Sequence, residues 1–219
     1  MSQKTLKQLA AEKALTYISK GERLGVGTGS TVDCLIALLP EVRHHIDVVV
    51  SSSERSTEQL LELGFKVLPM TDVESLTLYI DGADEINDKL QMIKGGGAAL
   101  TREKIVAAHA DRFICIADQS KYVDVLGKFP LPVEVIPMAL GHVQRELNKL
   151  GDARVREGVI TDNGNPIIDV FGLEITDPVA LETHINQIVG VVTNGIFAHR
   201  PADVLVLATD NGVQVIEAK

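Results

Sequence analysis

Residues 78–104 read LYIDGADEINDKLQMIKGGGAALTREK, and the rest of the chain is organised around this stretch. An apolar run ends at Asp81 and Asp84, Lys94 stands directly before three glycines, and a helical pattern begins near Thr101. Three consecutive glycines lose much conformational entropy on folding and bury no side chain, so a mere connector of this composition would be costly. Their expected use is to let backbone N–H groups approach a ligand closely. Carboxylates, a cation and backbone donors in one loop system suit a substrate that develops charge while it reacts.

On both sides of this stretch, apolar strands alternate with helices. The strands are expected at 23–27, 47–50, 65–68, 75–80 and 112–117, with helices over 3–18, 32–39, 54–63 and 100–110. Such alternation predicts an α/β fold, with a mostly parallel sheet and helices on both faces. Ligands of open sheets of this kind bind beyond the carboxyl ends of the strands. The segments 28–31, 81–84 and 118–121 each follow a strand, so we expect them at one edge of the sheet.

The pattern changes after Gly127. The run LPVEVIP contains prolines, which favour an edge strand, and the strands at 153–156 and 166–171 read as a hairpin around an Asp-Asn-Gly-Asn turn. Helices over 140–150 and 178–188 complete an antiparallel α+β pattern. The strand 203–208 then returns to the first pattern, with 212–216 pairing beside it. The sequence therefore predicts a large α/β catalytic domain of residues 1–130 and 200–219, and a smaller α+β domain of residues 131–199.

Composition excludes several classes of protein. The 219 residues carry a net charge of -9, which gives no electrostatic support to a nucleic-acid partner. No apolar run is long enough to cross a membrane, and the N-terminal helix lacks the apolar block of a signal peptide. Cys34 and Cys115 both lie in apolar surroundings, as expected of reduced thiols. We therefore expect a cytoplasmic protein.

A loop rich in Gly, Ser and Thr follows the first strand, in the sequence GVGTGSTV. A strand, such a loop and a helix together present backbone donors and hydroxyls to an anion. The loop is not a Walker motif, because no Gly-Lys-Ser/Thr follows. It also fails the dinucleotide pattern, whose third glycine would fall at Ser30. The loop is interpreted as a phosphate- or carboxylate-binding segment, and the alternative is a tight turn with a hydroxyl cap.

Asp81 and Asp84 lie three residues apart across a Gly-Ala turn, and three interpretations compete. A metal site is one, although no histidine or cysteine is near in sequence and the spacing does not fit a calcium loop. Turn chemistry is the second, because Asp and Gly favour turns. Acid–base work on substrate hydroxyls is the third, and Lys94 with its glycines favours it.

Three further charged residues also have two interpretations each. Lys94 follows an apolar pair and could aim its ammonium at an oxyanion, or it could be a surface lysine with a buried stem. Glu103, in the first turns of a helix, could be a general base or only a carboxylate favourably placed at a helix N-terminus. Lys121 is a candidate cation for the pocket or a solvated loop residue.

The segments VGTGSTV, YIDGADEI, KGGGAALTREK and ADQSK together resemble the type A family of ribose-5-phosphate isomerase. The resemblance runs over the whole chain, including the smaller domain and the strand DVLVLAT. It implies an enzyme that interconverts the aldose ribose 5-phosphate and the ketose ribulose 5-phosphate. It further implies a homodimer that uses neither metal nor organic cofactor.

The resemblance also implies roles for individual residues. Glu103 would move a proton between C1 and C2, while Asp81, Asp84 and Lys94 would handle the hydroxyl protons and the enediolate charge. The implied substrate-binding residues are Thr28, Gly29, Ser30, Thr31, Asp81, Gly82, Ala83, Asp84, Lys94, Gly95, Gly96, Gly97 and Lys121. The residues alone are consistent with this set, since enediolate chemistry needs a base, a cationic or N–H-rich cradle and groups that shuttle protons.

Two alternatives come from other classes of protein. One is a sugar-phosphate sensor, which by resemblance would carry a helix-turn-helix domain ahead of the sensor, whereas only one helix precedes the first strand here. The other is a CoA-transferase-like enzyme on a related scaffold, which would need a nucleophilic glutamate and a larger pocket. Turnover of ribose 5-phosphate would separate the three.

Overall fold

The computed structural model describes residues 1–218, and their contacts divide them into two compact units. The first unit comprises Met1–Ala83, Arg102–Tyr122 and the chain from Ala202 to the end of the described part. The second comprises Asp84–Thr101 and Val123–Pro201. These units differ from the expected domains in three segments, 84–101, 123–130 and 200–201, which the contacts group with the second unit. The domain boundaries themselves stay a prediction.

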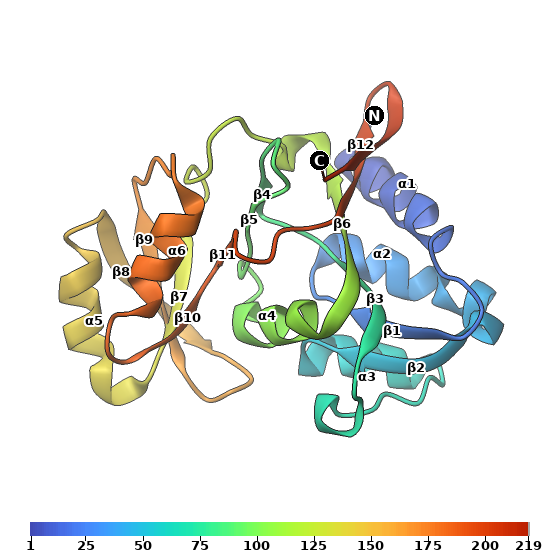
Figure 1. Ribbon diagram of the computed structural model, residues 1–219, viewed down its shortest axis with the longest axis horizontal. Helices are drawn as coiled ribbons and strands as arrows, with labels where there is room; N and C mark the ends of the chain where they lie inside the picture. The colour runs from blue at the N-terminus through green and yellow to red at the C-terminus, as the bar shows by residue number, and fades with distance from the viewer. Residues whose placement is uncertain (219) are drawn as a thin grey trace. The chain divides into compact units, whose positions relative to one another are not determined.

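The first unit is built on a six-stranded sheet of order β13-β12-β6-β3-β1-β2 (Figure 1). Every pair of neighbours is parallel except β12 and β13, which form an antiparallel hairpin. The sheet therefore confirms the mostly parallel architecture expected from the sequence. Its strands are β1 (Glu22–Val26), β2 (Ile46–Ser51), β3 (Leu76–Asp81), β6 (Ala110–Asp118), β12 (Val204–Thr209) and β13 (Gly212–Glu217).

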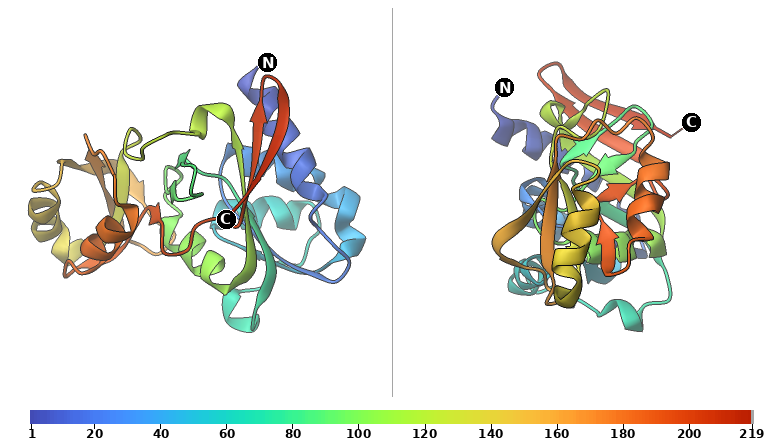
Figure 2. Two further views of the ribbon diagram at one scale, coloured as in Figure 1. Left: turned by 45° about the horizontal axis from the view of Figure 1, so that its top comes forward. Right: turned by 90° about the vertical axis from the view of Figure 1, so that its left-hand side faces the viewer.

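Helices cover both faces of this sheet. Helices α1 (Gln3–Leu15), α2 (Ser30–Leu38) and α3 (Glu54–Glu62) contribute to one apolar cluster with alternate residues of the strands. Helix α1, which buries several alanines, packs beside α2 (Figures 1 and 2). Helix α4 (Leu100–His109) lies on the opposite face of the sheet, where Val106 packs against the backbone at Gly25.

The parallel register brings the carboxyl ends of neighbouring strands to one edge of the sheet. Val26, the last residue of β1, is opposite Ser51 of β2 and Ile80 of β3. The segments that follow these strands are therefore neighbours, as the sequence predicted for 28–31 and 81–84. The loop after β6 begins at the same edge.

One expected strand does not form. The segment 65–68 makes only an isolated bridge between Val67 and Val49. Phe65 is buried in the apolar cluster, and its amide donates to the carbonyl of Leu60 near the end of α3. This amide therefore caps the helix C-terminus and does not join a β-ladder. Pro69 follows at once and has no N–H to extend the pairing.

The second unit contains a four-stranded antiparallel sheet of order β10-β7-β9-β8. Helices α5 (Leu140–Leu147) and α6 (Pro178–Asn186) share an apolar cluster with one face of this sheet. A separate three-stranded sheet, β11-β5-β4, carries the segment around Lys94. The strands are β4 (Glu85–Ile86), β5 (Met92–Ile93), β7 (Leu131–Val135), β8 (Asp152–Ile160), β9 (Pro166–Phe171), β10 (Val191–Asn194) and β11 (Ile196–Phe197).

The expectation of an edge strand at LPVEVIP is wrong, because β7 lies between β10 and β9. Pro132 is tolerated there because it stands where β10 has just ended, opposite Gly195. The Gly195 amide donates to the Pro132 carbonyl at 2.8 Å, and proline has no N–H to return to the Gly195 carbonyl. The backbone amide of Lys94 donates to that carbonyl instead, at 2.8 Å.

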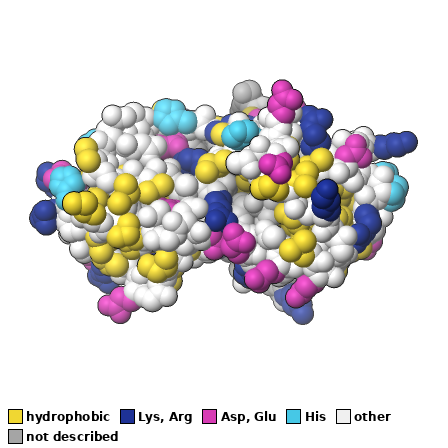
Figure 3. All heavy atoms as spheres, turned by 90° about the horizontal axis from the view of Figure 1, so that it is seen from below, with side chains coloured by type: hydrophobic (Ala, Val, Ile, Leu, Met, Phe, Trp, Pro, Cys, Tyr) yellow, Lys and Arg dark blue, Asp and Glu magenta, His cyan; other side chains and the backbone are white. Residues whose placement is uncertain are grey.

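The surface carries charges of both signs. On the face drawn in Figure 3, Lys and Arg side chains are interspersed with Asp and Glu among apolar groups. Within residues 1–218, no helix is both long and apolar enough to span a bilayer.

Candidate functional site

In the first unit, Asp81 ends β3 with a fully buried side chain. Its Oδ1 accepts hydrogen bonds from the backbone amides of Thr28, at 3.0 Å, and Gly82, at 2.7 Å. Its Oδ2 accepts one from the hydroxyl of Tyr79. Asp81 therefore joins the loop after β1 to the end of β3, and it brings together two segments that are about fifty residues apart in sequence.

Gly27 makes this arrangement possible. A Cβ atom at this position would lie 1.9 Å from Cγ of Asp81, which is far inside van der Waals contact. The side chain of Asp81 thus occupies the space that any other residue at position 27 would need. A glycine is therefore required at position 27 by the close approach of Asp81.

A hydroxyl cluster lies beside this carboxylate. Thr28 Oγ1 is 3.0 Å from Ser52 Oγ and donates to Ser53 Oγ at 2.7 Å. Ser53 bonds in turn to Ser56, at 3.1 Å, and Ser56 to the carbonyl of Gly27, at 2.8 Å. We did not select these serines from the sequence, although Ser51-Ser52-Ser53 follows a strand at the same sheet edge and could have indicated them.

Ser30 and Thr31 begin helix α2. Gly29 precedes them as the N-cap residue with φ of 125° and supplies no side-chain cap. Helix N-termini of this kind can bind an anion through their first backbone amides. Lys7 Nζ of helix α1 donates to Ser30 Oγ at 2.8 Å. Lys7 adds positive charge to the loop, and nothing in its helical sequence context indicated this role.

Tyr79 and Glu103 are two further buried polar groups of the first unit. Glu103 is 3% exposed and lies in the first turn of α4. Burial raises the pKa of the Tyr79 phenol well above its usual range, and the negative charges of Asp81 and Glu103 raise it further. The Tyr79 hydroxyl therefore keeps its proton and remains a donor to Asp81. Sequence reasoning missed Tyr79, which reads as an ordinary strand aromatic.

Lys121 lies in a short 3₁₀ turn (Gln119–Lys121) directly after β6. Asp118 caps this turn by accepting from the backbone amide of Ser120 at 2.9 Å. The side chain of Lys121 is partly buried. It thus belongs to the first unit and follows a strand at the expected edge.

In the second unit, Lys94 is 2% exposed, so the surface-lysine interpretation is wrong. Its ammonium lies 5.6 Å from the centre of the Phe197 ring, within the range of a cation–π contact. Its backbone is tied to Gly195, where a Cβ atom would lie 2.2 Å from the Lys94 carbonyl oxygen. The lysine is therefore held at its backbone and along its side chain.

The three glycines follow as a turn in which Gly96 and Gly97 are exposed. The Ala98 amide donates to the carbonyl of Gly95 at 3.0 Å. Asp84 is partly buried, and its Oδ2 accepts from the backbone amide of Gly96 at 2.8 Å. The two aspartates thus have different surroundings, since Asp81 is buried among donors of the first unit and Asp84 orders the glycine turn of the second.

Within residues 1–218, no group of three or more His, Cys, Asp or Glu side chains is arranged to hold a metal ion. Asp81 and Asp84 both accept hydrogen bonds from backbone amides. Asp81 Oδ1 and Asp84 Oδ2, which a metal site would need as ligands, are therefore already hydrogen-bonded to backbone amides.

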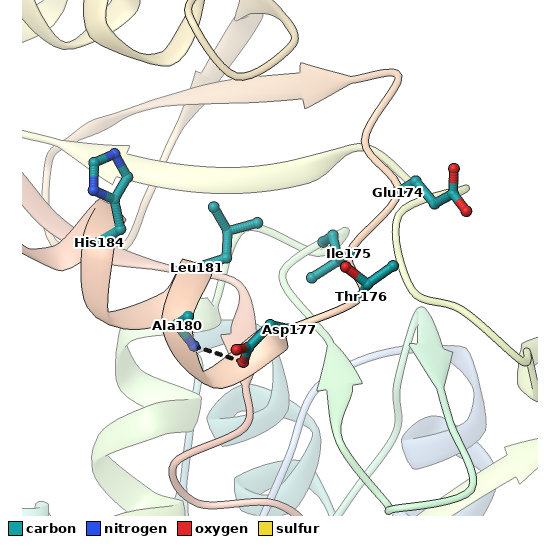
Figure 4. Close-up of a pocket in the computed structure, with 7 residues that line it drawn as sticks. All are labelled: Glu174, Ile175, Thr176, Asp177, Ala180, Leu181 and His184. Atoms are coloured by element: carbon teal, nitrogen blue, oxygen red, sulfur yellow. Dashed lines mark hydrogen bonds between the residues drawn. The ribbon is translucent and has the colours of Figure 1, made fainter.

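A hollow of about 340 Å³ in the second unit contains none of the residues selected from the sequence (Figure 4). Asp177 points toward the start of α6, where it accepts from the amide of Ala180 at 3.1 Å. This carboxylate is a helix cap. The hollow is lined by Glu174, Ile175, Thr176, Asp177, Ala180, Leu181 and His184.

Comparison with known families agrees with these features. Residues 48–212 match the family model described as ribose 5-phosphate isomerase A, also called phosphoriboisomerase A. The matched range includes Asp81, Asp84, Lys94, Glu103 and Lys121. The loop at 28–31 lies before it.

Solved structures extend the similarity to the whole chain. Ribose 5-phosphate isomerase A from Neisseria gonorrhoeae is 47% identical with a TM-score of 0.97, over 100% of this chain and 98% of that one. The enzyme from Methanocaldococcus jannaschii is 38% identical with a TM-score of 0.92, over 99% and 100%. A D-ribose-5-phosphate isomerase in complex with phospho-erythronic acid is 39% identical with a TM-score of 0.93, over the same shares. The chain belongs to the ribose 5-phosphate isomerase A family.

Proposed function

We propose that this protein interconverts D-ribose 5-phosphate and D-ribulose 5-phosphate through an enediolate intermediate, in the non-oxidative branch of the pentose phosphate pathway. The observation that carries the proposal is the match of the entire chain to enzymes of this activity, with the motifs of residues 78–104 intact. The reaction moves one hydrogen from C2 to C1 and one from O2 to O1. It therefore needs a base, a group that stabilises the enediolate oxygen and groups that exchange hydroxyl protons.

Glu103 is proposed as the base. It would take the C2 hydrogen of the open-chain aldose and return it to C1 of the enediolate. Its burial supports this role, because a group shielded from water can return the abstracted proton to the substrate before that proton is lost to solvent. Its place in the first turn of α4 gives it a rigid support.

Lys94, with the amides of Gly95 and Gly97, is proposed to stabilise the enediolate charge, while the Gly96 amide holds Asp84. Its buried ammonium acts in surroundings of low dielectric, where a charge interacts more strongly than in water. Asp84 is proposed to exchange hydroxyl protons, since it is partly exposed beside the glycine turn. Asp81 is proposed to assist, with its carboxylate held by Thr28, Gly82 and Tyr79.

The phosphate end is assigned to Thr28, Gly29, Ser30, Thr31 and Lys121. The start of α2 supplies backbone donors, and Ser30 already contacts the ammonium of Lys7. A helix N-terminus with hydroxyls and lysines suits a dianionic phosphate.

The ligand of one relative supports the same chemistry. That isomerase was solved with phospho-erythronic acid, which combines a phosphate with a carboxylate. A planar, charged carboxylate resembles the planar enediolate that we propose for this protein. The ligand is therefore a suitable inhibitor with which to test it.

We further propose that the protein acts in the cytoplasm, as a homodimer and without a metal or organic cofactor. Its two cysteines, Cys34 partly buried and Cys115 fully buried, are consistent with a reducing compartment. Chromatography with light scattering would test the dimer.

The deciding experiment is a direct assay of ribulose 5-phosphate formation from ribose 5-phosphate, run in deuterated water. The proposal predicts turnover, with deuterium entering the carbon-bound position that the shuttled proton occupies. Binding of the sugar phosphate without turnover would favour the sensor. Acyl transfer from a CoA thioester, with no isomerisation, would favour the CoA-transferase alternative.

A further inference from the structure

The two faces of the four-stranded sheet in the second unit differ in character. One face packs its alternating apolar residues against α5 and α6. The residues between them point to the other face, and there a buried carboxylate, Glu134, accepts from Thr101 at the start of α4 and from Thr161 and Asn165 of the β8–β9 hairpin. The same face meets the glycine segment, because Pro132 lies against Gly95, 3.2 Å from the position of a Cβ atom there.

A second polar pair on this sheet is Arg156 of β8 and Asp169 of β9. The guanidinium donates from Nε to Oδ2 at 2.8 Å and from Nη2 to Oδ1 at 2.6 Å, a two-pronged contact that fixes its plane. The side chains are 17% and 12% exposed, so the pair is largely shielded from water. Asp169 therefore holds Arg156 in one orientation.

The remaining arm of the guanidinium reaches the glycine segment. Nη1 of Arg156 donates to the carbonyls of Gly95, at 3.1 Å, and Gly96, at 3.2 Å. The amide of Gly96 donates in the other direction, to Asp84. The peptide unit between Gly95 and Gly96 is thus clamped at its carbonyl by Arg156 and at its N–H by Asp84. In a trans peptide these two groups point opposite ways.

We propose that Arg156 is a positioning residue for the reaction, and that it fixes the orientation of the Gly96–Gly97 peptide unit, whose Gly97 N–H is proposed to receive the enediolate oxygen. Arg156 holds the carbonyl of Gly96, which belongs to the peptide unit between Gly96 and Gly97. Because this peptide is trans, its N–H, on Gly97, points away from the guanidinium. Glycines have no side chain to restrict them, so their amides need an external restraint to be preorganised. The inference rests on the proposed function and adds to it a residue about sixty positions away.

The test compares Arg156→Ala with Arg154→Ala. Arg154 is two residues away on the same strand, and its ion pair with Asp152 is exposed. For Arg156→Ala we expect kcat/KM to fall about 10- to 100-fold, because misplacement by about 1 Å can cost 10²-fold. Hydrogen–deuterium exchange in the peptide that contains 94–100 should become faster. Arg154→Ala should match the wild-type protein in both measurements.

Two variants separate positioning from general stability. Arg156→Lys keeps the charge but lacks the fork, so it should recover little activity, whereas added guanidinium ion should partly restore Arg156→Ala. Asp169→Asn keeps Arg156 but loosens it, and provides the same readouts if Arg156→Ala fails to fold. A lower melting temperature with unchanged kcat/KM and unchanged exchange at 94–100 would overturn the proposal. The exchange readout needs no turnover, so it decides the inference even if the wild-type protein is inactive as an isomerase.

Discussion

Tyr79 donates its phenolic hydrogen to Asp81, two residues further along β3. Because the phenol is completely buried and near the negative charges of Asp81 and Glu103, its pKa is raised well above its usual range. The phenol therefore remains a hydrogen-bond donor to Asp81 over the whole physiological pH range. The pair connects the interior of the sheet, where Tyr79 stacks 4.7 Å from Phe113, to the polar edge.

Tyr79→Phe tests this pair through the pH dependence of stability. At neutral pH we expect a loss of roughly 1.5–3 kcal/mol, the value of a hydrogen bond to a charged group. Above about pH 10 the unfolded phenol loses its proton while the folded one keeps it, so the wild-type protein loses stability as pH rises. The stability difference between wild type and Tyr79→Phe should therefore shrink in urea titrations above pH 10. A difference that stays constant from pH 7 to pH 11 would contradict the raised pKa.

Glu103→Gln tests the proposed base. The amide is nearly isosteric, so we expect the fold and the affinity for phospho-erythronic acid to persist. Turnover should fall by at least ~10²–10⁴-fold, the usual contribution of a positioned general base. Exchange of the C2 hydrogen with deuterated solvent should fall in step. If a folded Glu103→Gln protein exchanges this hydrogen at nearly the wild-type rate, then Asp81 or Asp84 is the base and Glu103 only supports its helix.

Lys94→Met tests the proposed oxyanion stabiliser. Methionine keeps an apolar stem next to Phe197 but removes the charge, so packing is largely retained. We expect kcat to fall more than KM rises, by the equivalent of about 2.7–4 kcal/mol, because the oxyanion develops only on the way to the transition state. Steady-state kinetics with ribose 5-phosphate decides the point. A raised KM with wild-type kcat would instead make Lys94 a substrate-binding residue.

The phosphate end should respond in the opposite way. Ser30→Ala and Lys121→Ala should mainly raise KM, since each hydrogen bond to a charged group is worth roughly 1.5–3 kcal/mol. Dephosphorylated ribose should be a very poor substrate of the wild-type protein. Equal catalytic efficiency with ribose and ribose 5-phosphate would refute the phosphate assignment.

Removal of metal ions tests whether Asp81 and Asp84 act on substrate protons or bind a metal ion. We expect activity to survive exhaustive treatment with EDTA, since a buried lysine is proposed to supply the positive charge. The assay should be run with and without added Mg²⁺ after chelation. Activity that is lost and then restored by a divalent ion would make Asp81 and Asp84 candidate ligands.

Local patterns predicted much of the fold. The spacing of apolar residues located most strands of the sheet in the first unit and the helices that cover it. Strands and amphipathic helices can be located in this way because each has a characteristic apolar spacing within a few residues. Local patterns failed at 65–68 and at the position of β7, where the outcome depends on which partner a segment finds. No local pattern specifies that Gly195 takes its place beside Pro132, or that Phe65 closes the end of α3.

The sequence by itself determined the order of elements, the strand-end positions of Thr28 and Asp81, and the residue types of the candidate site, since each of these is a property of a short segment. Only the tertiary structure decided which groups meet. It placed Tyr79 against Asp81, Lys7 against Ser30, and Arg156 against the carbonyls of Gly95 and Gly96. The last two contacts join residues 23 and about 60 positions apart. Their formation depends on sheet register and helix packing, which arise from the summed burial of the whole chain and leave no mark on any one stretch.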